Sequence, residues 1–334
     1  MDEKRFPRRI GPESVKDIFL PNHTKILNLI CTLLFIAGII GMFLPGQESG
    51  PQKLRSMSEI SIAAHMLVFF LGGYLVFAFI PSFSARPLTG QILLLLSGAL
   101  IAGIVLEGIQ SIIPGRTASL RDIIANATGT MIFLSMRHLR NRQGHLLLYL
   151  PTITLAAFLL WPLYKAIADE YTAKMQFPLL AGFETPFEAS RFIRGTGRFG
   201  VTDEYAFSGK NSLRVDMGTQ TYSGIALEYM PRNWQGYSHL QIAVYNPQKE
   251  QVTLYIRIHD THHATSGRMI YADRFNRIFS ILPQQWTILE IPLKRVENAP
   301  RTRKMDMEEI TNVGFFVAKE PEPLTLYIDD IRLK

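Results

Sequence analysis

The chain has 334 residues, a formal net charge of +7 and a mean hydropathy of +0.11. It is too long for one compact core and too apolar for an ordinary soluble protein. Up to Lys174 there are 16 Lys and Arg against 10 Asp and Glu, and beyond it 19 against 18. The positive excess therefore flanks the apolar segments, which indicates membrane topology signals and argues against a nucleic-acid partner.

Five apolar runs occur in the first half, at residues 26–44, 60–80, 91–110, 119–136 and 146–166. Each is close to the roughly 20 residues that a helix needs to cross a bilayer. A charged leader over residues 1–25 precedes the first run, and no small-residue cleavage site follows it, so we expect a retained anchor. The only cysteine, Cys31, lies in this run, which rules out an intramolecular disulfide.

The distribution of Lys and Arg predicts the orientation. The leader and the turn at residues 137–142 are both rich in these residues, so both should be cytoplasmic. Five spans then place the N-terminus in the cytoplasm and the C-terminal half outside it. The run at 119–136 contains Arg121, Asp122 and Asn126, which leaves open whether it spans the membrane or re-enters.

A polar cluster is predicted at the outer ends of the third and fourth runs. Helical spacing puts Glu107 with Gln110 and Asp122 with Asn126, while the turn between them carries Arg116, and His65 can join at a similar depth. Ionisable groups at that depth are costly unless paired or wetted, so they mark either a functional site or a network that fixes helix packing. Arg116 would suit a lipid-linked phosphate. Gly103, Gly108 and Gly129 are expected close-contact positions.

These residues resemble the VanZ-like membrane proteins, a family named for a bacterial teicoplanin-resistance protein. The resemblance covers roughly residues 26–140 and rests on His65, Glu107-x-x-Gln110, Pro114-Gly115-Arg116, Asp122 and Asn126-x-x-Gly129. Where the family has an acidic-lysine pair before the histidine, this chain has Ser61-Ile62. The resemblance implies a bacterial integral protein of the cytoplasmic membrane that acts at the cell envelope, and it implies no particular reaction.

The pattern changes after Lys174 to short alternating runs separated by turn residues, which predicts an all-β sandwich. In VTLYIRIHD, Val252, Leu254, Ile256 and Ile258 should face the core. The expected fold is thus a helical membrane domain followed by a β-sandwich of the jelly-roll type. The expected divisions are the leader at 1–25, the membrane domain at 26–166, a linker at 167–180 and the sandwich at 181–334.

The order of features over residues 180–334 resembles the β-jelly-roll carbohydrate-binding modules and their galactose-binding-like relatives. It begins with Phe183-Glu184, continues through Trp234-Gln235-Gly236-Tyr237 and Asp273-Arg274-Phe275-Asn276, and closes with Leu326 to Ile331. In such modules, opening and closing acidic residues often hold a structural calcium ion. The resemblance therefore implies Glu184 and Asp330 as possible calcium ligands, with polar strand ends as the alternative, and it implies no other cofactor.

Sugar recognition requires aromatic faces next to planar hydrogen-bonding groups. The polar face of the VTLYIRIHD strand and the turn after it supply both; the candidate glycan-binding residues are Tyr255, Arg257, His259, Arg274 and Asn276. The alternative is that these side chains merely solvate the outer sheet. The histidine-rich run His259 to His263 matches no established zinc motif, and solvated turn histidines are the expected explanation.

These features favour a non-enzymatic envelope protein that recognises a polysaccharide or lipid-linked glycan through the membrane cluster and the sandwich. An enzyme acting on a lipid-linked saccharide is an alternative, with Glu107 or His65 as general base and Asp122 as orienting group. Against it, the sequence shows no nucleotide loop, metal-ligand set or activated nucleophile. A third alternative is that the sandwich binds another envelope protein.

Overall fold

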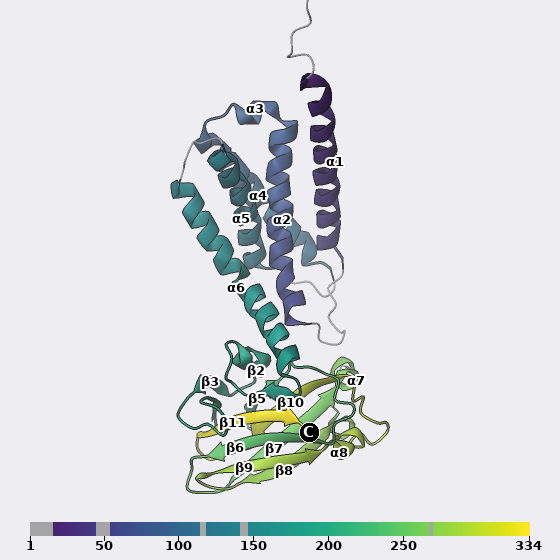
Figure 1. The fold of residues 1–334 in the computed structure, drawn as a ribbon, viewed down its shortest axis with the longest axis vertical. Helices are drawn as coiled ribbons and strands as arrows, with labels where there is room; N and C mark the ends of the chain where they lie inside the picture. The colour runs from purple at the N-terminus through teal and green to yellow at the C-terminus, as the bar shows by residue number, and fades with distance from the viewer. Residues whose placement is uncertain (1–15, 45–53, 114–117, 141–145, 267–269) are drawn as a thin grey trace, which may run out of the picture. The chain divides into compact units, whose positions relative to one another are not determined.

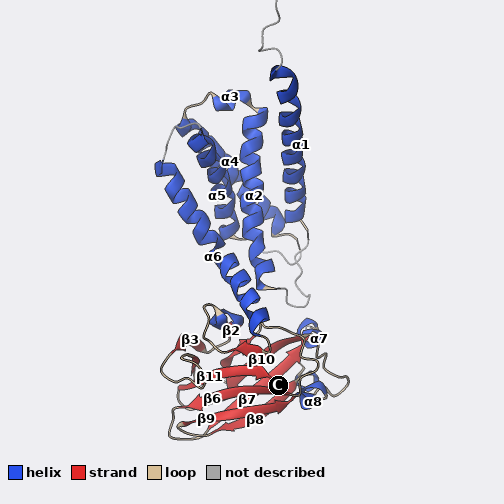
Figure 2. Cartoon of the chain, viewed as in Figure 1, coloured by secondary structure: helices blue, strands red, loops and turns tan. Residues whose placement is uncertain are grey.

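A computed structural model describes residues 16–44, 54–113, 118–140, 146–266 and 270–334 (Figure 1). The chain forms two compact units. The first, here called the helical unit, comprises Met1–Glu48 and Ile60–Trp161, and the second, the sandwich unit, comprises Ser49–Glu59 and Pro162–Lys334. The described strands all belong to the sandwich unit, which also includes the start of the second helix and the C-terminal half of the last long helix before the strands; Figure 2 shows helices and strands in separate colours.

Among the described residues, six helices precede the first strand: α1 (Lys16–Met42), α2 (Arg55–Phe79), α3 (Pro81–Ser84), α4 (Leu88–Gln110), α5 (Leu120–Arg140) and α6 (Leu146–Gln176). The expected linker at 167–180 was wrong over most of its length, because α6 continues to Gln176 and strand β1 begins at Leu179. The sequence AIADEYTAKMQ contains good helix formers, and Ala166, Asp169 and Ala173 lie on one buried face.

Four of the described helical segments are long and apolar enough to cross a membrane: His23–Met42, Arg55–Phe79, Leu88–Gln110 and Leu148–Gln176. The sequence predicted five such segments. The fourth predicted segment, now α5, is a single uninterrupted helix. It is too polar to count among these apolar segments because it contains Arg121, Asp122, Arg137 and His138. Its helical state was therefore predicted correctly and its apolar character was overestimated.

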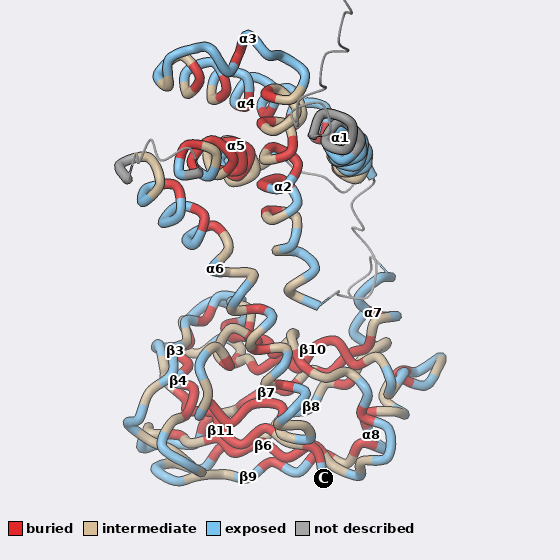
Figure 3. The backbone as a smooth tube through the Cα atoms, turned by 45° about the horizontal axis from the view of Figure 1, so that its top comes forward, coloured by how far each residue is buried: buried red, intermediate tan, exposed pale blue. Residues whose placement is uncertain are grey.

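Helix α5 tolerates these polar residues because it lies inside the helical unit. Figure 3 shows much of α5 as buried, whereas the described part of α1 is largely exposed. Ala125, Asn126 and Leu134 on α5 have no exposed surface. At Gly129 the backbone of α5 approaches α2 so closely that a Cβ atom would overlap the carbonyl oxygen of Met66. Glycine therefore permits the contact between the two helices.

The sandwich unit contains two antiparallel sheets. The first has the order β3-β4-β11-β6-β9, with β1 paired to β11, and the second has the order β2-β5-β10-β7-β8. The strands of the first sheet are β1 (Leu179–Ala181), β3 (Arg198–Thr202), β4 (Ser212–Met217), β6 (His239–Asn246), β9 (Gln285–Pro292) and β11 (Leu324–Leu333). Those of the second are β2 (Phe192–Arg194), β5 (Ser223–Leu227), β7 (Val252–Asp260), β8 (Phe275–Ile281) and β10 (Ile310–Val317).

The core of the sandwich follows from strand alternation. Val252, Leu254, Ile256 and Ile258 of β7 are all buried, as predicted, and they join a core cluster to which both sheets contribute. Short helical segments connect the strands: η2 (Glu188–Arg191), α7 (Thr261–Thr265), η3 (Tyr271–Asp273) and α8 (Leu293–Glu297). The outward-facing side chains of β7 therefore stand on a rigid surface.

Candidate functional site

The second sheet carries a groove on its outer face. Phe316 of β10 pairs with Gly224 of β5 on one side and with Tyr255 of β7 on the other. Two residues earlier in β10, Gly314 pairs with Ala226 and Arg257. Directly paired residues share a face of the sheet, as do residues i and i+2, so these two rows of side chains form one surface.

The groove encloses about 740 Å³ and combines apolar and hydrogen-bonding side chains. The residues that line it include Tyr222, Tyr255, Arg257, Tyr271, Arg274, Asn276, Arg277, Ile278, Gly314 and Phe316. Four of the five predicted glycan-binding residues are thus brought together: Tyr255, Arg257, Arg274 and Asn276. The size matches small-molecule clefts, which commonly enclose roughly 300–1,000 Å³.

Two glycines form part of the floor of the groove. A Cβ atom at Gly314 would lie 3.2 Å from Nε and Nη2 of Arg257, so the guanidinium of Arg257 lies across this position of β10. A Cβ atom at Gly224 would overlap the backbone of Phe315 on the neighbouring strand. Glycine in a strand interior commonly marks a place where another group approaches closely. Neither glycine was predicted from the sequence to line a site.

Aromatic rings form one wall of the groove. The rings of Tyr255 and Phe316 stack with centroids 5.2 Å apart and planes 16° apart, and Tyr222 meets Phe316 edge-on at 5.9 Å. Tyr222 is 63% exposed and Tyr271 is 68% exposed, so their faces are accessible to a ligand. Of these aromatic residues only Tyr255 was predicted from the sequence, because Tyr222 and Phe316 reach the groove through the pairing of distant strands.

Hydrogen-bond donors line the side of the groove next to the rings. Arg257 donates from Nη2 to Asn312 Oδ1 at 3.2 Å, and Asn312 in turn donates to Glu228 Oε1 at 2.9 Å. The Nε atoms of Arg257 and Arg274 are buried and have no hydrogen-bond partner among the described residues. Burial lowers the pKa of both guanidinium groups, and the charge of Arg274 lowers that of Arg257 further. A ligand that accepts hydrogen bonds would satisfy these donors.

His259 lies outside the groove lining. Its side chain is buried, at 8% exposure, and its ring packs 4.8 Å from that of His263. Burial and the nearby charge of Arg257 lower the pKa of His259 to about 3. His259 alternates with core-facing Ile258 as predicted, but the ring of His263 on α7 packs against it, so its side chain is buried.

The histidine-rich run has a structural arrangement in place of the predicted solvated turn. Asp260 caps α7 by accepting a hydrogen bond from the backbone N–H of His263, and its carboxylate pairs with Arg303. Arg303 also pairs with Asp273, which contacts His263 at 3.2 Å. These interactions join α7, η3 and the segment around Arg303 at one end of the groove-bearing sheet.

Glu184 and Asp330 accept hydrogen bonds from protein groups. Glu184 Oε1 accepts the backbone N–H groups of Lys210 and Asn211 at 2.8 and 2.7 Å. Asp330 accepts from Gln241 at 2.7 Å and pairs with the guanidinium of Arg332. Donors thus contact Glu184 Oε1 and both carboxylate oxygens of Asp330, and the guanidinium of Arg332 lies beside Asp330. A calcium requirement remains a prediction.

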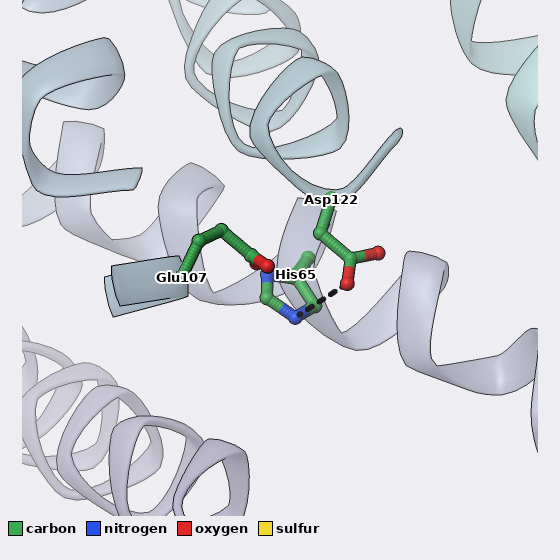
Figure 4. Close-up of side chains that lie close together, drawn as sticks. All are labelled: His65, Glu107 and Asp122. Carbon is green, nitrogen blue, oxygen red and sulfur yellow. Dashed lines mark ion pairs between the residues drawn. The ribbon is translucent and has the colours of Figure 1, made fainter. Parts of the chain in front are cut away.

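The helical unit contains a second group of functional side chains, the buried cluster of His65, Glu107, Asp122 and Asn126. They come from α2, α4 and α5, and Figure 4 shows His65, Glu107 and Asp122 converging. His65 Nδ1 lies 2.9 Å from Asn126 Oδ1, and His65 Nε2 lies 3.8 Å from Asp122 Oδ2. Glu107 Oε2 accepts the backbone N–H of Ser119 at 2.7 Å. The sequence therefore identified a group that does assemble.

The composition of the buried cluster would suit a metal ion. One ligand atom each of His65, Glu107 and Asp122 lies within 4.8 Å of the others, the only such group of three or more among the described residues. The side chains are also engaged with one another, which fits a packing network equally well. Gln110 lies apart and donates to the carbonyl of Met42 at 2.8 Å. Arg116 lies outside the described residues, and a ligand role for this cluster remains a prediction.

Comparisons with known proteins concern the sandwich. No known family matches the sequence, and no curated protein matches it, so the VanZ-like resemblance remains a prediction. An exo-beta-agarase structure is 15% identical with a TM-score of 0.39, covering 47% of this chain and 24% of its own. A second similar structure is the family 11 carbohydrate-binding module of Clostridium thermocellum in complex with a beta-1,3-1,4-mixed-linked tetrasaccharide. It is 15% identical with a TM-score of 0.34, and the match covers 46% of this chain and 93% of the module.

A third similar structure is a xylan-binding domain of family 22, which is 18% identical with a TM-score of 0.31 and covers 46% of this chain and 91% of its own. The chain spans only about a quarter of the agarase but nearly all of both binding modules. Identities and TM-scores this low carry no functional argument. The argument for function therefore rests on the groove itself.

Proposed function

We propose that this protein is a bacterial membrane-anchored glycan-binding protein, whose groove on the second sheet holds a polysaccharide chain outside the cytoplasm. The observation that carries the proposal is the combination of exposed aromatic rings and unpaired donors in one groove. Aromatic faces contact the apolar C–H surfaces of sugar rings, and planar guanidinium and amide groups hydrogen-bond to hydroxyl pairs. Tyr222 and Tyr255 provide the first chemistry, and Arg257, Arg274 and Asn276 provide the second.

Membrane attachment supports the proposal through local concentration. The four long apolar helical segments are suited to anchoring the chain, and many large apolar side chains on them are exposed. Those on α1 include Ile26, Leu27, Leu29, Ile30, Leu33, Leu34 and Ile40. A tethered module meets its ligand at a high effective concentration, so even weak sugar binding is sufficient for recognition at the envelope.

The test is binding of the full chain, in detergent micelles, to a panel of soluble polysaccharides, with affinities measured by microscale thermophoresis. The full chain is required because buried Arg191 of the sandwich pairs with Asp169 of α6 at 3.0 Å. We expect saturable binding that Tyr255→Ala weakens about tenfold, through loss of a stacked aromatic face.

Tyr245→Ala is the matched control. Tyr245 lies on the first sheet and stacks on Tyr205 with centroids 4.4 Å apart, much as Tyr255 stacks on Phe316 in the groove. If Tyr245→Ala abolished binding while Tyr255→Ala did not, the ligand would occupy the first sheet. Absence of binding to every glycan in the panel would contradict the proposal and favour a protein partner.

A further inference from the structure

Arginines surround the groove, and they continue beyond it. Arg257, Arg274 and Arg277 line the groove, and Arg274 and Arg277 also line an adjoining hollow of about 490 Å³. Arg295 and Arg301 line the far side of that hollow. The two cavities share Tyr271, Arg274, Asn276 and Arg277, so they adjoin at β8, and together they are called the track here. No described Asp or Glu lines either cavity.

These five arginines differ from the other buried or clustered arginines of the sandwich unit in lacking carboxylate partners. Arg191, Arg214, Arg232, Arg303 and Arg332 each form an ion pair. By contrast, none of Arg257, Arg274, Arg277, Arg295 and Arg301 forms an ion pair with any described residue. The guanidinium groups along the track therefore have no carboxylate at ion-pair distance among the described residues, although the charge of Glu228 acts on Arg257.

Two acidic side chains that are close in sequence to the arginines of the track are already paired with other basic residues. Asp273 belongs to η3 but pairs with Arg303, and Glu297 of α8 pairs with Lys294 and Lys304. Arg277, Arg295 and Arg301 are exposed, and the backbone N–H of Arg301 is fixed by a 3.0 Å hydrogen bond to Ala272. The fold thus places several guanidinium groups beside one track and commits the neighbouring carboxylates elsewhere. Like charges held together are costly unless an anion joins them.

We propose that the track binds an acidic polysaccharide, in which carboxylate or sulfate groups on the sugar rings pair with Arg257, Arg274, Arg277 and the arginines beyond them. This inference rests on the proposed glycan-binding function and specifies the class of glycan. Arginine presents two parallel N–H donors to a carboxylate or sulfate, so it provides geometry as well as charge. The rings of Tyr255 and Phe316 contact the sugar faces between the charged substituents.

The charge distribution favours an acidic glycan over a nucleic acid. From residue 175 onward the chain has 19 Lys and Arg against 18 Asp and Glu, so this part of the chain has a formal net charge of only +1. A nucleic-acid-binding domain typically carries a large net positive charge over a broad face. The local pattern instead fits a ligand whose anionic groups are spaced along a narrow chain.

The experiment compares the full chain in detergent with four soluble polymers at low and moderate salt. Polygalacturonate presents carboxylates, dextran sulfate presents sulfate esters, dextran is the neutral glycan, and single-stranded DNA is a non-glycan polyanion. We expect at least about tenfold tighter binding to one of the acidic glycans than to dextran or DNA, because charge-assisted hydrogen bonds are stronger than neutral ones. The affinity should fall with added salt.

Three variants locate the interaction. Arg274→Ala and Arg277→Ala should each weaken binding to the acidic glycan about tenfold, with little change in binding to dextran. Arg277 is exposed, so its variant tests the track even if Arg274→Ala fails to fold. Arg198→Ala is the matched control, because Arg198 is an exposed arginine on β3 of the first sheet and should leave the affinity unchanged.

The outcomes separate this inference from the proposed function. Equal affinity for dextran and both acidic glycans would overturn the acidic specificity while supporting glycan binding. Equal binding of all polyanions, DNA included, that survives Tyr255→Ala would show a nonspecific charge effect and overturn it as well. Binding to none of the glycans would contradict both proposals. A preference between polygalacturonate and dextran sulfate would support the inference and identify the acidic group.

Discussion

The two polar groups of this protein differ in how their side chains are satisfied. In the helical unit, His65, Glu107 and Asn126 are at most 3% exposed, and they contact one another or nearby backbone. In the groove, Tyr222 is 63% exposed, and the Nε atoms of Arg257 and Arg274 lack partners among the described residues. One group is enclosed and largely paired internally, with Asn126 Nδ2 left without a described partner, whereas the other is open to solvent and short of acceptors.

This difference separates structural from ligand-binding roles. A buried polar group stabilises the fold only while its partners remain, so a change there should appear as lost stability. An exposed side chain contributes little to folding and is free to contact a ligand, so its removal should appear as lost binding. The predictions below test this division.

The largest expected effect is at the contact between α2 and α5. Gly129→Ala should lower the free energy of unfolding by about 3 kcal/mol, at the upper end for overpacking, because the added Cβ overlaps the backbone carbonyl of Met66 and neither helix can yield easily. Thermal unfolding of the full chain in detergent measures this change.

Gly108→Ala is the matched control in α4. The sequence predicted that Gly108 also makes a close contact, and this was wrong, because a Cβ atom there meets nothing within 4 Å among the described residues. Alanine should therefore be neutral or stabilise the helix by about 0.5–1 kcal/mol. Equal destabilisation by both substitutions would show that glycine is needed for a reason other than this contact.

The second prediction concerns acid stability of the sandwich. His259 has a pKa of about 3 in the folded protein, below its usual value, so the unfolded chain binds more protons at moderately low pH. Stability should fall as the pH is lowered from about 6.5 toward 3, at about 1.4 kcal/mol per pH unit for this group. His259→Phe should remove about 2 kcal/mol of the loss between pH 6.5 and 4.5.

The measurement is urea unfolding of the two proteins at a series of pH values, followed by tryptophan fluorescence, which reports on buried Trp234 of the sandwich. Each protein at pH 7.5 serves as its own reference, so any packing change caused by phenylalanine cancels. Parallel curves for wild type and variant would show that His259 is not the group responsible.

Much of this arrangement could be predicted from local patterns. Alternation identified the buried face of β7 and placed Tyr255 and Arg257 opposite it, and helical spacing brought Asp122 and Asn126 onto one face of α5. Both patterns depend on residues a few positions apart. Local geometry therefore anticipated most of the groove's β7 side and most of the buried cluster.

The missed features depend on distant strand pairing or on local irregularity. Phe316 and Tyr222 enter the groove because β10 lies between β5 and β7, which no local period reveals. In β11 the register with β6 shifts between Asp329 and Arg332, and Asp330 has a positive φ of 49°. The neighbouring Asp329 accepts the backbone N–H groups of Phe207 and Ser208.

The third prediction compares two asparagines. Asn126→Ala should cost about 1–2 kcal/mol of unfolding free energy, because His65 Nδ1 loses its buried partner. The loss should stay below about 3 kcal/mol, the upper end for a buried group that loses its partner, because Asn126 Nδ2 makes no hydrogen bond with a described residue. This amide lies close to α4, where a Cβ atom at Gly103 would be 3.0 Å from Nδ2. Thermal unfolding in detergent measures the effect.

Asn276→Ala in the groove is the comparison. Its side chain makes one long hydrogen bond, 3.4 Å, to the carbonyl of Tyr271, so the stability change should be within about 0.5 kcal/mol. Binding of the preferred polysaccharide should weaken instead. A stable Asn126→Ala variant together with an unstable Asn276→Ala variant would reverse the assignment of roles to the two regions.

The smallest expected effect is at Tyr222, where the ring contributes to binding alone. Tyr222→Ala should weaken binding of the preferred polysaccharide by about 1 kcal/mol, several-fold in affinity, because an exposed aromatic face is lost. The unfolding temperature should not change, since the ring is 63% exposed and contacts Phe316 only at its edge.

Tyr171→Ala, which removes a ring that is 67% exposed on α6 and outside the groove, should change neither quantity. If Tyr222→Ala lowered the unfolding temperature as much as Asn126→Ala does, the groove aromatics would be part of the folded framework, and the distinction between an open binding region and an enclosed structural one would not hold.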